Sequence, residues 1–285
     1  MQRLWAQFVS NHTRRWVPTA LSSQEVVSFV HVSVGGQMTA AADSSGKAYT
    51  WGCGGSKRLG HGSSNNEMVP RVLQPLASVF VTRVTCGHMH VAVVTSVGSI
   101  FTWGDGEFGK LGHGDFTCTA HSPAFPPLPY ALHTPGNVES VSVPTFCRLM
   151  RDIACDVACG KDHTLALTST GGLLAWGCNK DGRLGLGHTQ TLYEPNRSRL
   201  PRAHVSYAIS QCLRSVPLQG MTASCVSAGW DHSSAVIDGR AYTWGRGVKG
   251  QLGDGEGQSK KQVMTQFFKP KEPNDCAAIP GACVG

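Results

Sequence analysis

Charged and aromatic residues are scarce in this 285-residue sequence, at 15% and 8% of the chain. No apolar run approaches the roughly 18 residues that a membrane-spanning helix needs, so no membrane span is predicted. Glycine and proline, by contrast, number 34 and 15. Many short strands joined by tight turns fit this balance better than long helices do. We therefore predict an all-β chain.

The sequence also lacks the short signatures of common catalytic and metal sites. It has no Gly-rich phosphate loop, no Gly-x-Ser-x-Gly elbow and no Cys-x-x-Cys pair. Its eleven cysteines are an odd number, and the spacing of Cys155 and Cys159 matches no zinc signature. We expect no catalytic residues, no cofactor and no metal, and we interpret the cysteines as reduced thiols of an intracellular protein.

Residues 1–25 differ in composition from the rest of the chain. Arg3, Arg14 and Arg15 occur before the first acidic residue, Glu25, and apolar residues alternate with polar ones. This pattern indicates a mitochondrial presequence. The alternative is a basic tail on a cytoplasmic or nuclear protein.

One sequence string recurs four times after this segment. Trp-Gly, six residues, and then Leu-Gly-x-Gly begin at Trp51, Trp103, Trp176 and Trp244. A second element, Gly-x-x-His, precedes three of these tryptophans and ends at His90, His163 and His232, whereas the first copy has Thr39 at this place. Such self-similarity is the sequence signature of repeat architectures.

Between the two elements lie two apolar stretches separated by a glycine turn, as in 91–94, Gly98 and 100–103. This arrangement is typical of a β-hairpin. Radially repeated sheets bury their faces on their neighbours, which predicts the blades of a β-propeller.

The combination of Gly-x-x-His, a hairpin, Trp-Gly and Gly-x-Leu-Gly resembles the repeat of the regulator of chromosome condensation family. The copies lie near 33–62, 84–114, 157–187 and 226–255, within a propeller region of 26–285. That family usually closes seven blades, so four copies predict a partial propeller of about four blades. The alternative is a truncated fragment of a longer propeller protein.

The repeated histidines and tryptophans are expected to be structural, because a residue placed once per blade cannot converge on one ion. The segment Gly229-Trp230-Asp231-His232-Ser233 is similar to the repeated tryptophan segments of plant ultraviolet-B photoreceptors of this fold. A single copy cannot build such a cluster, so we expect Trp230 to belong to the core with the other aromatic residues.

Two connections exceed the basic repeat, at 115–150 and 193–220. The first is rich in proline and either docks as an extended arm or is a tolerated insertion without a partner. The second carries Arg197, Arg199, Arg202 and Arg214 against the single acidic residue Glu194, and it either binds a phosphate backbone or an acidic protein face or is a solvated basic loop. We also expect a basic rim on one face of the blades, formed by the residues just before each Leu-Gly: Arg58, Lys110 and Arg183.

These features predict a macromolecular interaction scaffold or regulatory subunit rather than an enzyme. A protein partner is expected first, and the net charge of +7 also permits RNA or another acidic partner. The founding member of the family is a guanine nucleotide exchange factor for the small GTPase Ran and binds nucleosomes. The resemblance therefore implies a second function, nucleotide exchange on a small GTPase.

Overall fold

The computed structural model describes residues 27–113, 140–147, 153–189, 214–215 and 221–265. Within these residues sixteen β-strands form four antiparallel sheets of four strands each. The same part of the chain holds four short 3-10 turns and no α-helix. The predicted all-β fold is therefore confirmed.

Each sheet is one blade, built from strands that follow one another in the chain. Blade 1 consists of β1 (Phe29–Gly35), β2 (Met38–Asp43), β3 (Ala48–Gly52) and β4 (Glu67–Val72). Blade 2 consists of β5 (Val81–Cys86), β6 (His90–Thr95), β7 (Ile100–Gly104) and β8 (Val141–Cys147). Blade 3 consists of β9 (Ala154–Cys159), β10 (His163–Thr168), β11 (Leu173–Gly177) and β12 (Arg214–Ser215). Blade 4 consists of β13 (Ala223–Ala228), β14 (His232–Ile237), β15 (Arg240–Gly245) and β16 (Lys260–Thr265).

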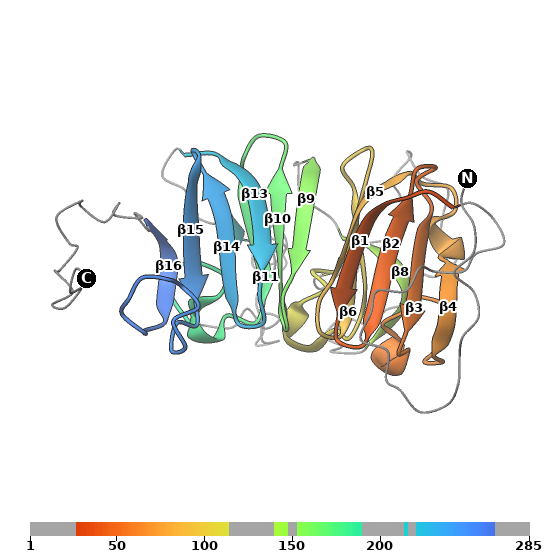
Figure 1. Ribbon diagram of the computed structural model, residues 1–285, viewed down its shortest axis with the longest axis horizontal. Coiled ribbons are helices and arrows are strands. Elements are labelled where there is room, and N and C mark those ends of the chain that lie inside the picture. The colour runs from red at the N-terminus through yellow and green to blue at the C-terminus, as the bar shows by residue number, and fades with distance from the viewer. Residues whose placement is uncertain (1–26, 114–139, 148–152, 190–213, 216–220, 266–285) are drawn as a thin grey trace, which may run out of the picture.

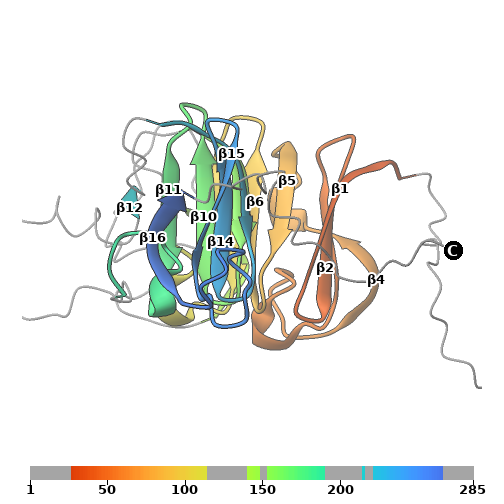
Figure 2. The same cartoon turned by 60° about the vertical axis from the view of Figure 1, so that its left-hand side comes forward.

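The blades stand side by side, with β4 of blade 1 and β16 of blade 4 at opposite ends of the row (Figure 1). The first strands contact one another in the order β1, β5, β9 and β13, so these four strands line the common axis. The turned view separates blade 1 from the sheets of blades 3 and 4 (Figure 2). Four propeller blades therefore form an open arc within the described residues.

The two long connections each contribute the fourth strand of a blade. β8 lies within 115–150 and pairs with β7, and β12 lies within 193–220 and pairs with β11. The rest of the Pro-rich connection, 115–139 and 148–150, lies outside the described residues. These strands could not be recognised from the repeat pattern, because fourth strands follow the Leu-Gly turns at unequal distances.

The Trp-Gly…Leu-Gly string forms the turn that closes the third strand of each blade. In three blades a threonine directly before the tryptophan donates its hydroxyl hydrogen to the carbonyl of the leucine, as Thr102 does to Leu111 at 2.6 Å. Gly112 follows that leucine with a φ of +69°, and a Cβ there would lie 2.7 Å from Trp176 Nε1 of the next blade. Glycine is required at this place because the neighbouring blade packs directly on it.

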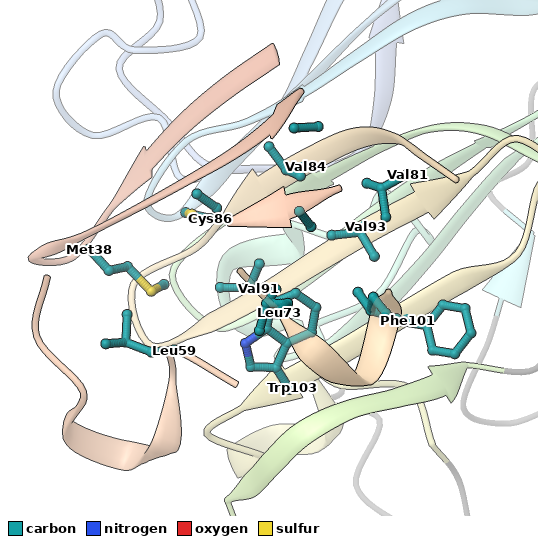
Figure 3. Packing of buried hydrophobic residues seen from close by; sticks show 14 of the residues in the cluster. Met38, Leu59, Leu73, Val81, Val84, Cys86, Val91, Val93, Phe101 and Trp103 are labelled. Carbon is teal, nitrogen blue, oxygen red and sulfur yellow. The ribbon is translucent and has the colours of Figure 1, made fainter. Parts of the chain in front are cut away.

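Three apolar clusters fill the three contacts between neighbouring blades. Figure 3 shows the first, in which Trp103 and Val91 of blade 2 meet Leu59 and Leu73 of blade 1. Trp103, Trp176 and Trp244 are each 0% exposed. A buried aromatic ring removes a large apolar surface from water, so these clusters stabilise the stacking of the blades. Trp103, Trp176 and Trp244 each lie in one of the three inner contacts.

The pairing of β2 with β3 corrects one alignment made from the sequence. Met38 pairs with Gly52 as His90 pairs with Gly104, and Thr39 pairs with Trp51 as Thr164 pairs with Trp176. Met38 therefore occupies the histidine position of blade 1. Thr39 occupies the next position, which carries a hydroxyl in blades 3 and 4.

Candidate functional site

The basic residues that precede each Leu-Gly are buried between blades and do not form an exposed rim. Arg58, Lys110 and Arg183 are 6%, 1% and 3% exposed. Each directly follows a 3-10 turn and is its C-cap residue. The prediction of an exposed basic rim is therefore wrong for these three residues, because their charged groups are buried inside the protein.

Lys110 and Arg183 make ion pairs across blade contacts. The Lys110 Nζ lies 2.6 Å from Asp105 of its own blade and 3.0 Å from Asp162 of blade 3. Arg183 Nη1 lies 2.7 Å from Asp231 of blade 4. A buried charge is tolerated only when it is paired and hydrogen-bonded, and these carboxylates supply both conditions.

Arg58 takes a different set of partners. It donates to the carbonyls of Gly55 at 2.7 Å and Gly36 at 2.5 Å in blade 1, and to that of His88 in blade 2 at 3.5 Å. Blade 2 has Met89 at the position that carries Asp162 in blade 3, so no carboxylate faces Arg58 there. Carbonyl oxygens replace the carboxylate at this contact.

The backbone carbonyls of the same residues accept hydrogen bonds from tryptophans of the next blade. Trp103, Trp176 and Trp244 donate their indole N–H to the carbonyls of Arg58, Lys110 and Arg183 at 3.0, 2.9 and 2.9 Å. The hydroxyls of Thr164 and Ser233 donate to the Lys110 and Arg183 carbonyls at 2.8 and 2.7 Å. One residue per blade thus anchors the next blade through both its side chain and its backbone.

The histidines of the Gly-x-x-His element also join neighbouring blades. His90 Nε2 lies 2.9 Å from the Thr164 hydroxyl, and His163 Nε2 lies 2.9 Å from the Ser233 hydroxyl. Because both hydroxyls already donate to carbonyls, each imidazole donates its Nε2 hydrogen. The sequence predicted buried imidazoles bonded to backbone, whereas the partner is a hydroxyl of the next blade.

Burial keeps these two imidazoles neutral. It lowers the pKa of His163 to about 3, with a further contribution from the Arg183 charge. Burial likewise lowers the pKa of His90 well below its ordinary value, assisted by Lys110. The pKa of His232 is also lowered by burial, and the Asp231 carboxylate opposes that shift.

The surface with binding character lies where the loops between first and second strands meet at one end of the axis. Trp230 is 60% exposed there. Its ring centroid lies 5.1 Å from that of His88, and Lys161 Nζ lies 5.8 Å above its ring. These three side chains come from blades 4, 2 and 3, and we call them the axial cluster. Trp230 does not belong to the core, so that expectation was wrong.

A concavity of about 1150 Å3 adjoins the axial cluster and shares His88 and Lys161 with it. Its lining combines five acidic with five basic residues: Asp105, Glu107, Asp162, Asp181, Asp231, Lys161, Lys180, Arg183, Arg246 and Lys261. Both signs of charge alternate on this wall, so no cationic groove of the kind that follows a phosphate backbone is formed. An exposed aromatic anchor beside mixed charges is typical of a protein-docking surface.

The sequence contained one signal for the axial cluster. Its residues share the position after the glycine of the Gly-x-x-His element, where blade 1 has Gly36. Only the three-dimensional arrangement shows that this position brings residues 69 or more apart in sequence together at the axis. A tryptophan in a position that varies between repeats, beside a Gly present in all four and a His present in three, indicates exposure rather than core.

The remaining candidate residues of the second connection are not tested by the structure. Arg197, Arg199 and Arg202 lie outside the described residues, and Arg214 is placed only by its backbone in β12. The described residues hold seven cysteines, and no disulfide joins any two of these. Burial raises the pKa of Cys86 to about 12, which leaves that thiol unreactive.

The described residues offer neither a metal site nor a membrane span. No three His, Cys, Asp or Glu side chains gather there as metal ligands would. No helix in the same part of the chain is long and apolar enough to cross a bilayer.

Comparison with known proteins identifies relatives over most of the chain. The plant ultraviolet-B receptor UVR8 of Arabidopsis thaliana is 30% identical over 241 residues, which cover 84% of this chain and 46% of the receptor. The human E3 ubiquitin-protein ligase HERC2 is 32% identical over 227 residues, which cover 79% of this chain and 4% of the ligase. The chain therefore spans less than half the length of these relatives.

Solved structures share the fold at lower identity. Human WBSCR16 matches with a TM-score of 0.62 and 19% identity, covering 85% of this chain and 53% of that protein. Prp20p from Saccharomyces cerevisiae, solved in a study of its binding to Gsp1p and histones, matches with a TM-score of 0.63 and 19% identity, covering 86% and 51%. The family model of the RCC1-like domain matches residues 6–278. Together with the four repeated blades, this match establishes that the chain belongs to the RCC1-like domain family.

Proposed function

We propose that this protein is a non-catalytic interaction scaffold or regulatory subunit that docks a protein partner on the axial cluster and the adjoining concavity. The observation that carries the proposal is the exposed Trp230, held between His88 and Lys161. A large aromatic residue fixed by its neighbours loses little conformational freedom on binding, which makes it an effective anchor.

The charges of the surface favour a protein over a nucleic acid. Five carboxylates line the concavity beside five cations, and a phosphate backbone would meet as many like charges as opposite ones. A folded protein surface carries both signs and can match such a pattern. RNA binding through the arginines of 193–220 remains a separate prediction, which Ala substitutions at Arg197, Arg199 and Arg202 would test.

The test compares partner capture by three forms of the full chain. Trp230→Ala removes the anchor, and Met68→Ala is a matched control because Met68 is 88% exposed on β4, away from the axis. Proteins cross-linked to the wild type and to Met68→Ala should be lost from Trp230→Ala, with unchanged circular dichroism. Equal recovery by all three forms would remove the axial cluster from the proposal.

A second candidate function is nucleotide exchange on a small GTPase, supported by the likeness to Prp20p and its reported binding to Gsp1p. The measurement is release of a fluorescent guanine nucleotide from a panel of small GTPases. If the protein accelerates nucleotide release and Trp230→Ala abolishes that acceleration, both proposed functions would use the same surface. No acceleration across the panel would eliminate exchange and leave the scaffold proposal standing.

A further inference from the structure

The contacts between blades are directional, and each joins two different faces. The trailing face of a blade presents its histidine and the carbonyl of its basic residue, and the leading face of the next blade presents a hydroxyl and the indole N–H. The carbonyl and indole groups meet at all three inner contacts. The histidine and hydroxyl groups meet at two of them, because blade 1 has Met38 and blade 2 has Val91 at these positions. At the ends of the arc, blade 1 leaves a leading face open and blade 4 leaves a trailing face open among the described residues.

The open leading face of blade 1 is apolar. Val32 and Val34 of β1 are 62% and 72% exposed. The residues at the same positions of β5, Val84 and Cys86, are 1% and 6% exposed because blade 1 covers them. A pair of exposed valines on a flat strand indicates a surface that another blade would cover.

The open trailing face of blade 4 carries the groups that cover such a surface elsewhere in the arc. The Ser33 hydroxyl accepts a hydrogen bond from the Cys86 amide at 3.0 Å, and the Thr85 hydroxyl accepts one from the Cys159 amide at 3.2 Å. Ser227 occupies the same position in blade 4 and is exposed. The amide that it would accept by this rule is that of Val34.

The histidine and hydroxyl positions match in the same way. His232 is half-buried, and no ring hydrogen bond is seen for it among the described residues. Thr39 carries the hydroxyl position of blade 1 and is only partly buried. Blade 4 thus presents the imidazole, and blade 1 presents the hydroxyl, of a contact that the arc makes twice internally.

Both positions of the ion pair between blades carry an uncharged residue on the open faces. Lys110 and Arg183 meet Asp162 and Asp231 inside the arc. Blade 4 has Gln251 at the basic position and blade 1 has Gln37 at the acidic position. Two amides can bond to each other, whereas a lone buried ion facing an amide would be costly. The open faces are therefore complementary to each other in charge as well as in hydrogen bonding.

We propose that a second copy of this chain docks the leading face of its blade 1 on the trailing face of blade 4, so that copies associate head to tail. Blades 1 and 4 of one chain lie at opposite ends of the arc, so these two faces can meet only between two copies (Figure 1). Unlike faces in contact make the association heterologous, and it closes if two arcs complete a ring. This inference is independent of the axial cluster.

Mixing two damaged chains tests the direction of the contact. Val32→Glu places a charge on the leading face of blade 1, and Ser227→Glu places a charge on the trailing face of blade 4, so each should block association through that face. Each variant alone should have the mass of one chain, 30.3 kDa, by sedimentation equilibrium. Their mixture should form pairs and nothing larger, because the intact trailing face of the first still fits the intact leading face of the second.

Two controls carry charge at exposed positions outside both faces. Val69 is 64% exposed on β4, and Ser64 is exposed in the turn before it, so Val69→Glu and Ser64→Glu should associate like the wild type. Thermal unfolding of every variant checks that the fold is kept. The proposal is overturned if the wild type stays at the mass of one chain at all concentrations, if the controls dissociate as well, or if the mixture forms no pairs.

Discussion

The ammonium group of Lys110 lies between two carboxylates from different blades, 2.6 Å from Asp105 and 3.0 Å from Asp162. The lysine side chain is 1% exposed, and the side chains of Asp105 and Asp162 are 14% and 13% exposed. This triad gives the middle of the arc an ionic contact in the place where sequence alone suggested a binding rim.

Replacing Lys110 by methionine should therefore destabilise the protein. Two buried carboxylates would lose their counter-charge, and breaking a buried pair costs about 3 kcal/mol or more. The measurement is urea unfolding at neutral pH. Lys161→Met is the control, because Lys161 is 38% exposed and its closest carboxylate contact is 3.8 Å, and it should change stability by less than about 1 kcal/mol. Equal effects of the two substitutions would contradict the triad's role.

The neutral histidines predict loss of stability on mild acidification. The pKa of His163 is about 3 in the folded protein, and that of His90 is also lowered well below its ordinary value. Below about pH 6.5 the unfolded chain takes up protons that the folded chain refuses, so stability falls as the pH falls. Between pH 6.5 and 5 the His163 imidazole should cost about 1.6 kcal/mol, and His90 should act in the same direction.

The check is the free energy of unfolding at a series of pH values from 7.5 to 5. His163→Gln keeps a hydrogen-bond donor but has no proton to take up, so its slope against pH should be shallower than that of the wild type. An unchanged slope would show that His163 titrates normally.

Gly87 should not tolerate a side chain, because the ring of His90 occupies that space. A Cβ there would lie 2.5 Å from His90 Cε1 and 2.4 Å from the Gly160 carbonyl. Gly87→Ala is expected to cost about 2 kcal/mol through forced repacking. Gly55→Ala is the matched control, since its nearest contacts lie at 3.5 and 3.6 Å, and it should change stability by about 0.5 kcal/mol or less. Thermal melts of the two variants would separate these outcomes.

Tryptophans at equivalent positions should differ in importance. Trp103 donates to the Arg58 carbonyl and is fully buried, whereas Trp51 lies on the open face and is only half-buried. Trp103→Phe leaves a buried carbonyl short of a donor and should cost about 1 to 3 kcal/mol, and Trp51→Phe should cost less than half as much. Unfolding in the Val32→Glu background, which keeps the chains apart, makes the comparison. A larger loss at Trp51 would contradict the assignment of the open face.

The sequence predicted the features that every blade shares, and the structure supplied those that depend on neighbours. The spacing of Trp103 and Leu111 was enough to predict the turn and the propeller, because a fixed spacing encodes local geometry. The burial of Lys110 was not predicted, since a charged residue beside a glycine turn has the same sequence appearance whether water or Asp162 faces it. The exposure of Trp230 was missed for the opposite reason, because aromatic residues in repeats are usually core.

The pairing of basic residues with the following blade also records the order of the blades. Lys110 and Arg183 each require an aspartate on the blade that comes next, and Arg58 is the one that faces Met89 instead. If blade 2 were moved to follow blade 3, Arg183 would meet Met89 and lose its carboxylate from the next blade. Repeats that look interchangeable in sequence are thus specific for particular neighbours. In permuted or duplicated arrays of this chain, the buried ion pairs between sheets would favour some blade orders over others.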